Sequence, residues 1–306
     1  MKILVTGGAG FIGSNLVDAL IQRKNKVLVI DNLSTGKKEN LNKKAKFYKL
    51  DICSKKILEI FKKEKPEIVF HLAAQINVRK SVEDPLFDAK VNILGSLNLL
   101  EGAKKTNVKK IIFASTGGAL YGETKIIPTP ENHPIWPESP YGICKMTVER
   151  YLNYYWRLFK IPFVSLRLGN VYGPRQSPEG EAGVVAIFTQ KMLKNEDVFV
   201  FGDGRQTRDF VFVGDVVNAF LKSIKKKVSG FFNVGTEKET SVNQIYSLLK
   251  NLTRTKSKKI KLPKKKGDLR RSCLKIKKAK KELDWEPKTP LLEGLKKTVI
   301  FLKNYS

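Results

Sequence analysis

The sequence predicts an α/β protein in which a doubly wound parallel sheet carries helices on both faces and is joined to a smaller mixed α/β part. Two observations support this prediction. Through the first half of the chain, short apolar runs alternate with segments whose apolar residues recur at helical spacing. A glycine-rich stretch, residues 6–14, lies where the first apolar run passes into the first such segment.

The elements follow in order from these patterns. We expect strands at 2–6, 26–31, 46–50, 67–71, 109–114 and 162–168, and helices at 12–24, 54–63, 87–106 and 140–159. Beyond residue 168 the pattern predicts a helix at about 184–194, a glycine-rich turn at 201–207, a strand at 208–213, a helix near 215–226 and a strand near 231–234. We therefore divide the chain into a sheet domain, 1–168 with about 208–235, and a second domain, 169–207 with 236–306.

The glycine-rich stretch has the order of a dinucleotide-binding βαβ unit. Gly7 allows a tight turn, Gly10 lets the backbone approach a pyrophosphate, and Gly13 lets the helix pack against the strand. The helix N-terminus offers free N–H groups to the phosphates. Asp31 ends the second strand, where it can accept hydrogen bonds from the adenosine ribose hydroxyls and would repel a 2′-phosphate. These residues predict that the chain binds NAD rather than NADP.

Polar and small residues follow the next strands, at the edge of a parallel sheet where ligands bind. Asp51 follows the third strand, where we expect its carboxylate near an adenine amino group. The small residues of 71–75 would let a dinucleotide lie across the strand ends, and His71 is expected to be a structural hydrogen-bonding residue. Asn92, an amide inside an apolar helix, predicts a buried polar contact near the centre of the sheet.

A candidate catalytic pair begins the helix at 140–159. Tyr141 and Lys145 are four residues apart and therefore share one helix face. We expect the lysine charge to favour the tyrosine phenolate and lower its pKa, so that Tyr141 can remove a hydroxyl proton while hydride leaves the same carbon. Ser115 or Thr116, at the end of the preceding strand, could contact the substrate oxygen.

Composition bounds the remaining classes of function. The formal net charge is +29, and residues 251–306 hold 19 Lys and Arg against 5 Asp and Glu. A nucleic-acid-binding patch is one explanation, but the lysines are scattered, few aromatic residues lie among them, and no nucleic-acid motif is present. We therefore favour a solvated lysine-rich surface, with nucleic acid an unlikely partner.

The same composition suggests where the protein works. No apolar run is long enough to span a membrane, and Met1 leads directly into the first strand without room for a signal peptide. The three cysteines are widely spaced, and there are only two histidines, so we expect a reduced, cytoplasmic protein with no metal site.

With these motifs in place, the chain resembles the extended short-chain dehydrogenase/reductase family and, within it, the UDP-glucose 4-epimerases. The resemblance runs over nearly the whole chain. The segments that carry it are residues 6–14, 31–36, 71–75, 141–145, 167–175, 180–188, 201–204, 208–211 and 267–268. It implies a Rossmann fold, a bound NAD and a UDP-sugar substrate. It also implies a homodimer that is formed through helices 87–106 and 140–159.

The resemblance assigns roles by position. The cofactor would be bound by Gly7, Gly10, Phe11, Ile12, Gly13, Asp31, Asn32, Ser34, Thr35, Gly36, Asp51, Ile52, Leu72, Ala73, Ala74, Gln75, Asn92, Tyr141 and Lys145. The substrate would be bound by Thr116, Asn170, Gly183, Val184, Arg208, Lys265 and Asp268. Among these, Arg208 would pair with a diphosphate oxygen.

Several positions depart from the family pattern. Gly117 stands where many such epimerases carry a serine or threonine, so Thr116 or Ser115 would supply that hydroxyl. The acidic residues of the related dehydratases and decarboxylases are missing from this stretch. Lys265 replaces a usual arginine, and the small Ser272 stands where a bulkier residue often limits the pocket, which would leave room for a 2-acetamido group.

The expected activity is therefore reversible 4-epimerisation of a UDP-hexose, with UDP-glucose and UDP-galactose as the first candidates. UDP-N-acetylhexosamine or UDP-glucuronate 4-epimerisation is the nearest alternative. An RNA-binding protein of the same fold is an alternative from a different class, although such a protein would have no need of Tyr141 and Lys145.

Overall fold

A seven-stranded parallel sheet organises the computed structural model, which describes residues 1–179, 183–225, 227–264 and 269–305. Its strands lie in the order β11-β6-β5-β4-β1-β2-β3. They are β1 (Lys2–Thr6), β2 (Lys26–Asp31), β3 (Lys46–Lys49), β4 (Ile68–His71), β5 (Lys110–Thr116), β6 (Phe163–Leu168) and β11 (Gly230–Val234). The chain adds β2 and β3 on one side of β1 and then adds β4 and the later strands on the other side. Doubly wound sheets bind their ligands at this change in strand order, which here lies between β1 and β4. The predicted α/β class is confirmed.

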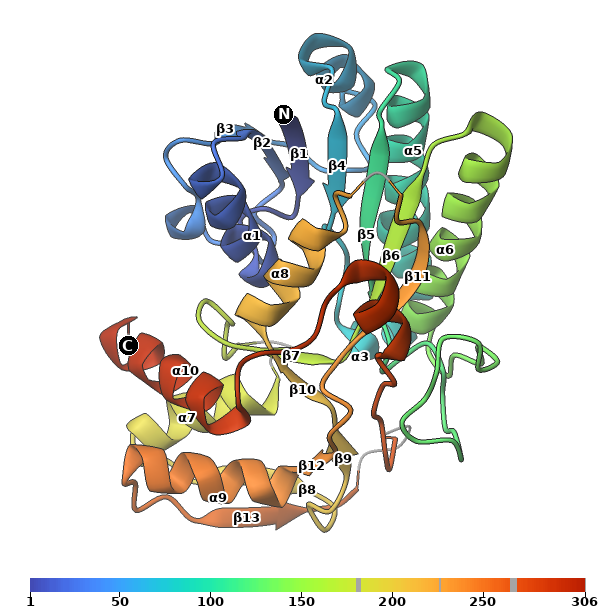
Figure 1. Cartoon of the computed structure of the whole chain (residues 1–306). Coiled ribbons are helices and arrows are strands. Elements are labelled where there is room, and N and C mark those ends of the chain that lie inside the picture. Colours follow the sequence, from blue (N-terminus) through green and yellow to red (C-terminus); the bar gives the residue numbers. More distant parts are fainter. Residues whose placement is uncertain (180–182, 226, 265–268, 306) are drawn as a thin grey trace.

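Helices cover both faces of this sheet (Figure 1). On one face, α1 (Phe11–Gln22) and α8 (Val213–Lys222) enclose the first apolar core. On the other face, α2 (Ile57–Glu64), α5 (Gly95–Lys105) and α6 (Pro140–Phe159) enclose the second. Successive residues of β1 belong to different cores, Ile3 to the first and Leu4 to the second, because side chains alternate across a strand.

Three short elements lead into α5 along the second face. They are α3 (Val78–Glu83), α4 (Pro85–Ala89) and a π-helical turn, Lys90–Leu94. The sequence predicted one regular helix at 87–106, and the structure differs because this turn interrupts it. Such π-helical turns often accompany functional sites. A short 3-10 helix, Lys38–Asn40, follows β2.

A third apolar core lies below the sheet, in the lower part of Figure 1. It is enclosed by α7 (Val184–Leu193), α9 (Val242–Thr253) and α10 (Leu291–Tyr305). Beside it, β8 (Val198–Phe201) pairs with β13 (Lys259–Leu262), β9 (Thr207–Arg208) with β12 (Thr240–Ser241), and β7 (Asn170–Tyr172) with β10 (Phe210–Phe212).

One segment that the sequence grouped with the second domain packs on the sheet instead. Ile276, Leu283 and Trp285 are buried in the first core beside α8, and a π-helical turn, Ala279–Leu283, lies between them. The indole nitrogen of Trp285 donates to the carbonyl oxygen of Asp215 at 2.9 Å. The chain therefore returns to the sheet before it forms α10.

The strand predicted at 208–213 is broken at Asp209. This residue is 1% exposed, and its carboxylate accepts hydrogen bonds from the backbone N–H groups of Thr236 at 2.7 Å and Leu274 at 3.1 Å. The two halves, β9 and β10, pair with different partner strands. The carboxylate thus ties together three distant parts of the chain.

Candidate active site

The glycine-rich loop between β1 and α1 leaves the backbone around Gly10 uncovered by side chains. A Cβ on Gly13 would lie 2.0 Å from the carbonyl oxygen of Gly7, and Gly7 itself has φ +71°. A Cβ on Gly10 would meet only the Gly7 oxygen, at 3.2 Å, and no side chain caps the start of α1 at Gly10. The first N–H groups of α1, from Phe11 and Ile12, are therefore available to an anion such as a pyrophosphate.

Asp31 closes this loop from the end of β2. It is 7% exposed, and its two oxygens accept hydrogen bonds from the backbone N–H groups of Ala9 at 3.0 Å and Leu33 at 2.8 Å. Each carboxylate oxygen can accept a further hydrogen bond. A Cβ on Gly36 would lie 3.0 Å from Asp31 Oδ1, so the following turn passes directly over the carboxylate. This donor and acceptor set fits the adenosine end of NAD.

The neighbouring predicted residues gather at the same edge of the sheet. Asn32 donates to the carboxylate of Asp51 at 2.8 Å, and Ser34 N–H donates to the Asn32 side chain at 3.0 Å. Ile52 is buried against Gly95, where a Cβ would lie 2.7 Å from its side chain. Thr35 follows in the turn that leads to Gly36.

The loop after β4 crosses the first glycine. The backbone N–H groups of Leu72 and Ala73 both donate to Thr6 Oγ1 at 3.2 Å, and a Cβ on Gly7 would lie 2.7 Å from the Ala73 nitrogen. Ala74 continues the loop to Gln75, whose backbone is bonded to the Asn92 side chain as donor and as acceptor, both at 2.9 Å. The buried polar contact predicted for Asn92 is present.

His71 is a structural residue in this arrangement, as predicted. Its ring nitrogens lie 2.8 Å from the hydroxyls of Thr6 and Ser96, and it is 4% exposed. Burial, and to a smaller extent the charge of Lys145, lower the pKa of His71 to about 3. The ring is therefore neutral near pH 7 and joins β1, β4 and α5 through hydrogen bonds.

Tyr141 and Lys145 lie at the start of α6, behind the end of β5. Ser139 caps this helix by accepting from the Gly142 N–H at 3.2 Å, which fixes where the helix begins. Lys145 Nζ donates to the carbonyl oxygen of Ala114 at 2.9 Å and lies 5.7 Å from the centroid of the Tyr141 ring. The spacing predicted from sequence thus places both side chains on one helix face.

The protonation states of this pair differ from the expectation. Burial, and then the charge of Asp88, raise the pKa of Tyr141. Burial lowers the pKa of Lys145 to about 8, although Asp88 partly opposes this effect. The net lowering of the Tyr141 pKa that was expected is therefore not found in the chain by itself, because burial raises this pKa by more than any effect of the lysine charge lowers it. Phenolate formation requires additional positive charge at the site.

The two candidate hydroxyls at the end of β5 lie in different surroundings. Ile111 and Phe113 pack in the core under α6, so by strand alternation Ser115 faces α6 and Thr116 faces the other side. Ser115 is 4% exposed, and its hydroxyl has no hydrogen-bond partner among the described residues. Thr116 is partly exposed, and its hydroxyl oxygen accepts from the Ala119 N–H at 3.2 Å, which leaves its proton available.

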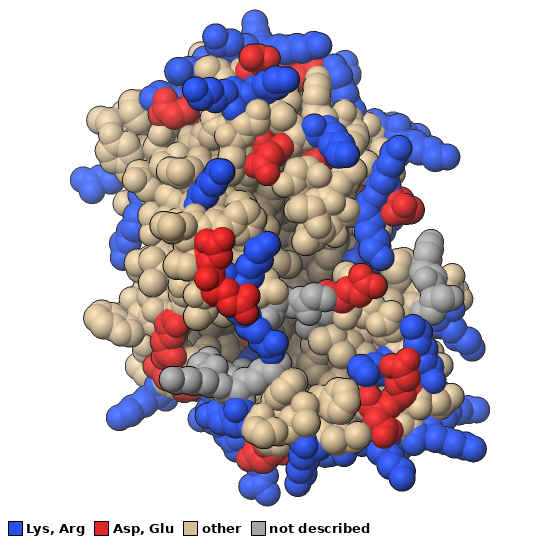
Figure 2. All heavy atoms as spheres, turned by 180° about the vertical axis from the view of Figure 1, so that it is seen from behind, with Lys and Arg blue, Asp and Glu red and all other residues tan. Residues whose placement is uncertain are grey.

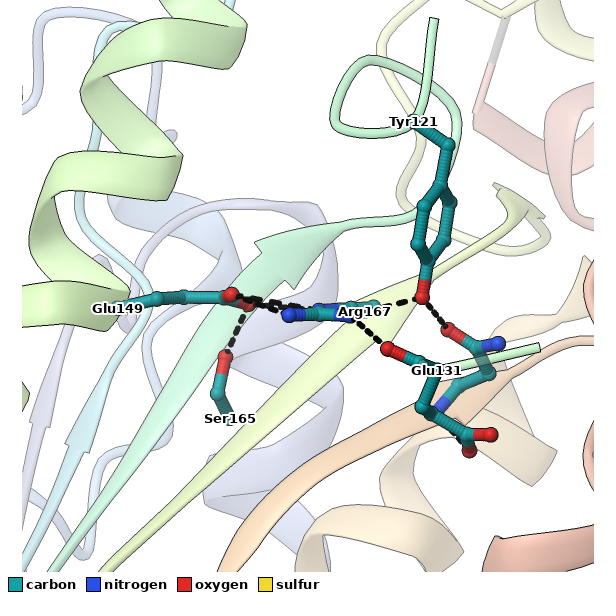
Figure 3. A network of polar contacts seen from close by, with 6 residues as sticks. Tyr121, Glu131, Glu149, Ser165 and Arg167 are labelled. Carbon is teal, nitrogen blue, oxygen red and sulfur yellow. Dashed lines mark hydrogen bonds and ion pairs between the residues drawn. The ribbon is translucent and has the colours of Figure 1, made fainter. Parts of the chain in front are cut away.

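A buried ion pair beside the catalytic helix was missed by the sequence reasoning. Arg167, 2% exposed, lies between Glu149 of α6 and Tyr121 of the loop after β5 (Figure 3). Its guanidinium nitrogens donate to the Glu149 carboxylate at 2.7 to 3.3 Å, to the Tyr121 hydroxyl at 2.8 Å and to the Glu131 carbonyl at 3.1 Å. Ser165 also donates to Glu149, at 2.8 Å. The signal in the sequence was an arginine inside the apolar strand 163–168.

Leu274 occupies the space over Gly117. A Cβ on Gly117 would lie 2.5 Å from the Leu274 side chain, so a serine or threonine would not fit at this position without rearrangement. This contact gives a structural reason for the departure from the family pattern noted in the sequence. A Cβ on Gly118 would lie 3.8 Å from Ser272 Oγ, so this small residue lies beside the same loop.

The residues predicted to bind the substrate lie near the start of the smaller part. Asn170, which is exposed, begins β7, and its N–H donates to the Asp209 carbonyl at 2.7 Å. Gly183 precedes Val184, the first residue of α7. Arg208 in β9 is partly exposed and donates to the Thr207 carbonyl at 2.8 Å. Lys265 and Asp268 lie outside the described residues.

Figure 2 shows the face opposite to that of Figure 1, with a hollow near its middle. Lys and Arg side chains gather along the upper and lower rims of this face, while acidic and basic side chains lie beside the hollow. No described helix is both long and apolar enough to cross a membrane. Within the described ranges, no group of three or more His, Cys, Asp or Glu is arranged to hold a metal ion.

Comparisons with known proteins agree with this geometry. Residues 3–235 match the model of the NAD dependent epimerase/dehydratase family. The chain is 44% identical to a UDP-glucose 4-epimerase of Mycolicibacterium smegmatis over the full length of both chains. The crystal structure of a Thermotoga maritima UDP-glucose 4-epimerase with UDP-glucose is 52% identical, with a TM-score of 0.98 over 100% of this chain and 99% of that one.

A second solved structure supports the cofactor assignment. The Thermus thermophilus UDP-glucose 4-epimerase in complex with NAD is 42% identical to this chain, with a TM-score of 0.96 and full coverage of both chains. The matched family is NAD dependent, and its model spans β1 to β11 with the glycine loop, Tyr141 and Lys145. The chain therefore belongs to the NAD dependent epimerase/dehydratase family.

Proposed function

We propose that this chain catalyses the NAD-dependent, reversible 4-epimerisation of a UDP-hexose, interconverting UDP-glucose and UDP-galactose through a 4-keto intermediate. The observation that carries the proposal is the placement of Tyr141 and Lys145 behind the end of β5, with Lys145 Nζ 2.9 Å from the Ala114 carbonyl. The glycine loop lies at the same edge of the sheet. Tyr141, the proposed proton acceptor, therefore lies at the same edge of the sheet as the loop proposed to bind the dinucleotide.

The residues of the chain handle the proton and the orientation of the sugar. Tyr141 accepts the proton of the 4-hydroxyl and returns it after the sugar has turned about its diphosphate link. Lys145, protonated below its pKa of about 8, favours the tyrosine phenolate and hydrogen-bonds the cofactor. When bound, NAD supplies reversible hydride acceptance at the sugar C4, so the cycle produces no net oxidation.

We assign the remaining contacts as part of the same proposal. The cofactor rests on residues 7–13, 31–36, 51–52 and 72–75, with Asn92 holding the last of these segments through Gln75. Thr116 contacts the substrate oxygen because its hydroxyl proton is available, and Ser115 supports the pair from the face under α6. Asn170, Gly183 and Val184 hold the nucleotide, and Arg208 pairs with the diphosphate.

We further propose the predicted division of labour between the two parts of the chain. Residues 1–168 with about 208–235 bind NAD, and 169–207 with 236–306, apart from the segment 276–285, bind the nucleotide sugar. The segment 276–285 is assigned to the sheet, because Trp285 and Leu283 belong to its core.

A direct assay tests the proposed activity. Purified protein loaded with NAD is incubated with UDP-galactose, and the formation of UDP-glucose is followed by NMR. We expect conversion to a fixed ratio of the two sugars, reached from either side, while the bound NAD content stays constant. Stoichiometric release of reduced cofactor during turnover, or a loaded enzyme that forms neither product nor keto sugar, would contradict the proposal.

A second candidate substrate is favoured by the small residue beside the loop after β5. Ser272 Oγ lies 3.8 Å from the position of a Cβ on Gly118, and a serine there fills less space than an aromatic or branched residue. UDP-N-acetylglucosamine is therefore the first alternative and UDP-glucuronate the second. A substrate panel read by mass spectrometry separates them. A Ser272→Tyr variant should lose UDP-N-acetylglucosamine turnover and keep UDP-glucose turnover if this residue sets the space.

We propose that the chain forms a homodimer through residues 87–106 and 140–159, which belong to α4, the π-helical turn, α5 and α6. Leu86 is 82% exposed and Leu94 is 58% exposed, and Ile143 and Leu158 of α6 are also exposed. Exposed large apolar side chains on helices that pack against one another favour a partner surface of the same kind. Light scattering should report a dimer for the native chain and a smaller species for Leu86→Glu. A monomeric native chain would exclude this part.

We also propose a cytoplasmic location, a role in galactose metabolism and no nucleic-acid partner. Cys53, Cys144 and Cys273 are free thiols, which suits a reducing compartment. The basic side chains on the face shown in Figure 2 are spread over several parts of it, with acidic side chains among them. RNA affinity that falls steeply with salt concentration would favour the RNA-binding alternative.

A further inference from the structure

Asp88, in α4, is a buried carboxylate that has no assigned role in the proposed reaction. The residue is 0% exposed, and one of its oxygens accepts hydrogen bonds from Gln75 Nε2 at 2.7 Å and Asn92 Nδ2 at 2.9 Å. Its other oxygen, Oδ2, is buried without a hydrogen-bond partner among the described residues. A buried carboxylate with an unpaired oxygen is costly unless a positive charge lies near it.

The hydrogen bonds hold this carboxylate in one place. Gln75 belongs to the loop after β4, and its backbone forms two hydrogen bonds with the Asn92 side chain, both at 2.9 Å. The Gln75 amide also donates to the Asn77 carbonyl at 2.9 Å. The loop, α4 and the π-helical turn are therefore joined by hydrogen bonds around Asp88.

This unit packs against α6, which carries the catalytic pair. The charge of Asp88 raises the pKa of Lys145 against the lowering effect of burial, and it adds to burial in raising the pKa of Tyr141. Burial, and then the contact of its side chain with the Asp88 carboxylate, raise the pKa of the Cys144 thiol to about 12, so this weak S–H donor, next to Lys145 in the sequence, faces Asp88. These effects place the carboxylate within electrostatic reach of the first turns of α6.

No other buried carboxylate is as well suited to balance Lys145 within the described residues. Glu149 also acts on Lys145 from α6, but its charge is matched by Arg167 in a 2.7 Å ion pair. The charged side chains on α3 and at the start of the π-helical turn are exposed to solvent, namely Arg79, Lys80, Glu83 and Lys90. Their effect is therefore screened by water.

We propose that Asp88 is a positioning residue that supplies the fixed negative charge which keeps Lys145 protonated beside Tyr141. The inference rests on the proposed function for its meaning in catalysis. The electrostatic part concerns the chain alone. Asp88 acts through Lys145, which in turn favours the tyrosine phenolate while the cofactor is bound.

The test replaces the carboxylate by an amide of the same shape. In Asp88→Asn, the amide oxygen can still accept from Gln75 and Asn92, so the charge is removed while these two hydrogen bonds can be kept. The protonation of Lys145 is followed by NMR of protein with isotope-labelled lysine, and the Lys145→Met variant identifies its signal. We expect the Lys145 midpoint, near pH 8 in the native chain, to fall by about one unit in Asp88→Asn.

The same change should appear in catalysis. The alkaline limb of kcat against pH should move to lower pH by about the same amount, while KM for the sugar changes little. The matched control is Asp84→Asn, four residues earlier. Asp84 is an exposed helix cap that accepts from the Phe87 N–H at 2.9 Å, and asparagine caps equally well. It removes the same charge and should move neither midpoint.

Two results would overturn the inference. One is a Lys145 midpoint in folded Asp88→Asn that equals the native value. The other is a Lys145 midpoint equal to the native value in the smaller Asp88→Ser variant, which replaces Asp88→Asn in the titration if the asparagine variant does not fold. The NMR titration needs no substrate, so it succeeds or fails independently of the UDP-galactose assay.

Discussion

Two buried cations, Lys145 of α6 and Arg167 of the neighbouring strand β6, are held in different ways. Arg167 shares a carboxylate fork with Glu149, and its remaining donors reach Tyr121 and the Glu131 carbonyl (Figure 3). Lys145, 3% exposed, donates to the neutral carbonyl of Ala114. Contact with Glu149 raises the pKa of Arg167 despite burial, whereas burial lowers the pKa of Lys145 to about 8.

The difference shows how one helix can carry both a structural and a functional charge. A fully paired guanidinium keeps its proton at every pH at which the protein is folded, so it fixes the register of α6 against β6. A lysine held by a single carbonyl can change its protonation state and can therefore tune Tyr141. The five predictions below test this contrast, from the largest expected effect to the smallest.

Loss of the proton acceptor should have the largest effect. Tyr141→Phe should lower kcat for UDP-galactose conversion by about 10²–10⁴-fold, because general acid–base catalysis is lost, while bound NAD is retained. The rate is measured by coupled assay and the NAD content after denaturation. Tyr154→Phe, on an exposed tyrosine of the same helix, is the matched control and should leave kcat unchanged. Native-like turnover in Tyr141→Phe would exclude its role.

Breaking the buried ion pair should unfold the protein more easily. Glu149→Gln should lower the free energy of unfolding by about 3–5 kcal/mol, because it leaves the Arg167 guanidinium buried without its counter-charge. Urea denaturation followed by circular dichroism gives this value. The double variant Glu149→Leu with Arg167→Met removes both charges and should recover part of the loss. If the single variant is as stable as the native chain, the pair has no structural role.

Removing the charge of Lys145 should change the free energy of unfolding in the opposite direction to Glu149→Gln. Its folded pKa of about 8 lies below the unfolded value of 10.5, so the unfolded chain binds more protons between these values. The free energy of unfolding should therefore rise with pH from about 8 to 10.5 and should carry the full penalty below pH 8. Lys145→Met combined with Asp88→Asn removes the buried ammonium together with the carboxylate that it balances, and should stabilise the fold by about 1–3 kcal/mol at pH 7 while reducing turnover.

Lys110 provides the control for that prediction. Burial lowers its pKa to about 8 as well, but its ammonium donates to the carbonyls of Ser223, Lys225 and Val228 just past the end of α8. Lys110→Met should therefore destabilise the fold by about 2 kcal/mol, because these carbonyls lose their donor. Equal signs for the Lys145 and Lys110 variants would refute the distinction between functional and structural lysines.

An exposed pair should matter least. Lys297 and Glu293 lie 2.6 Å apart on α10, and both side chains are about half exposed. Water screens this pair, so Lys297→Ala should change the free energy of unfolding by no more than about 0.5 kcal/mol. A loss of several kcal/mol in the same urea assay would show that surface charge contributes far more than the buried pairs suggest.

The fold was predictable wherever local pattern and burial agree. The strands at 2–6 and 26–31 and the helix at 140–159 have the predicted bounds, because apolar runs and a Ser-Pro helix start mark them locally. The break at Asp209 was not predictable. Its carboxylate is held by Thr236 and Leu274, which are 27 and 65 residues further along the chain.

The sequence by itself determined the fold class, the glycine loop ending at Asp31 and the spacing of Tyr141 and Lys145. Each of these depends on residues within one βαβ unit or one helical turn, so the chain order is enough to reveal them. Only the tertiary structure decided which charges are balanced. Asp88, Gln75 and Asn92 meet through packing of distant elements. Burial against those elements, rather than spacing along a helix, sets the proton affinities of Tyr141 and Lys145.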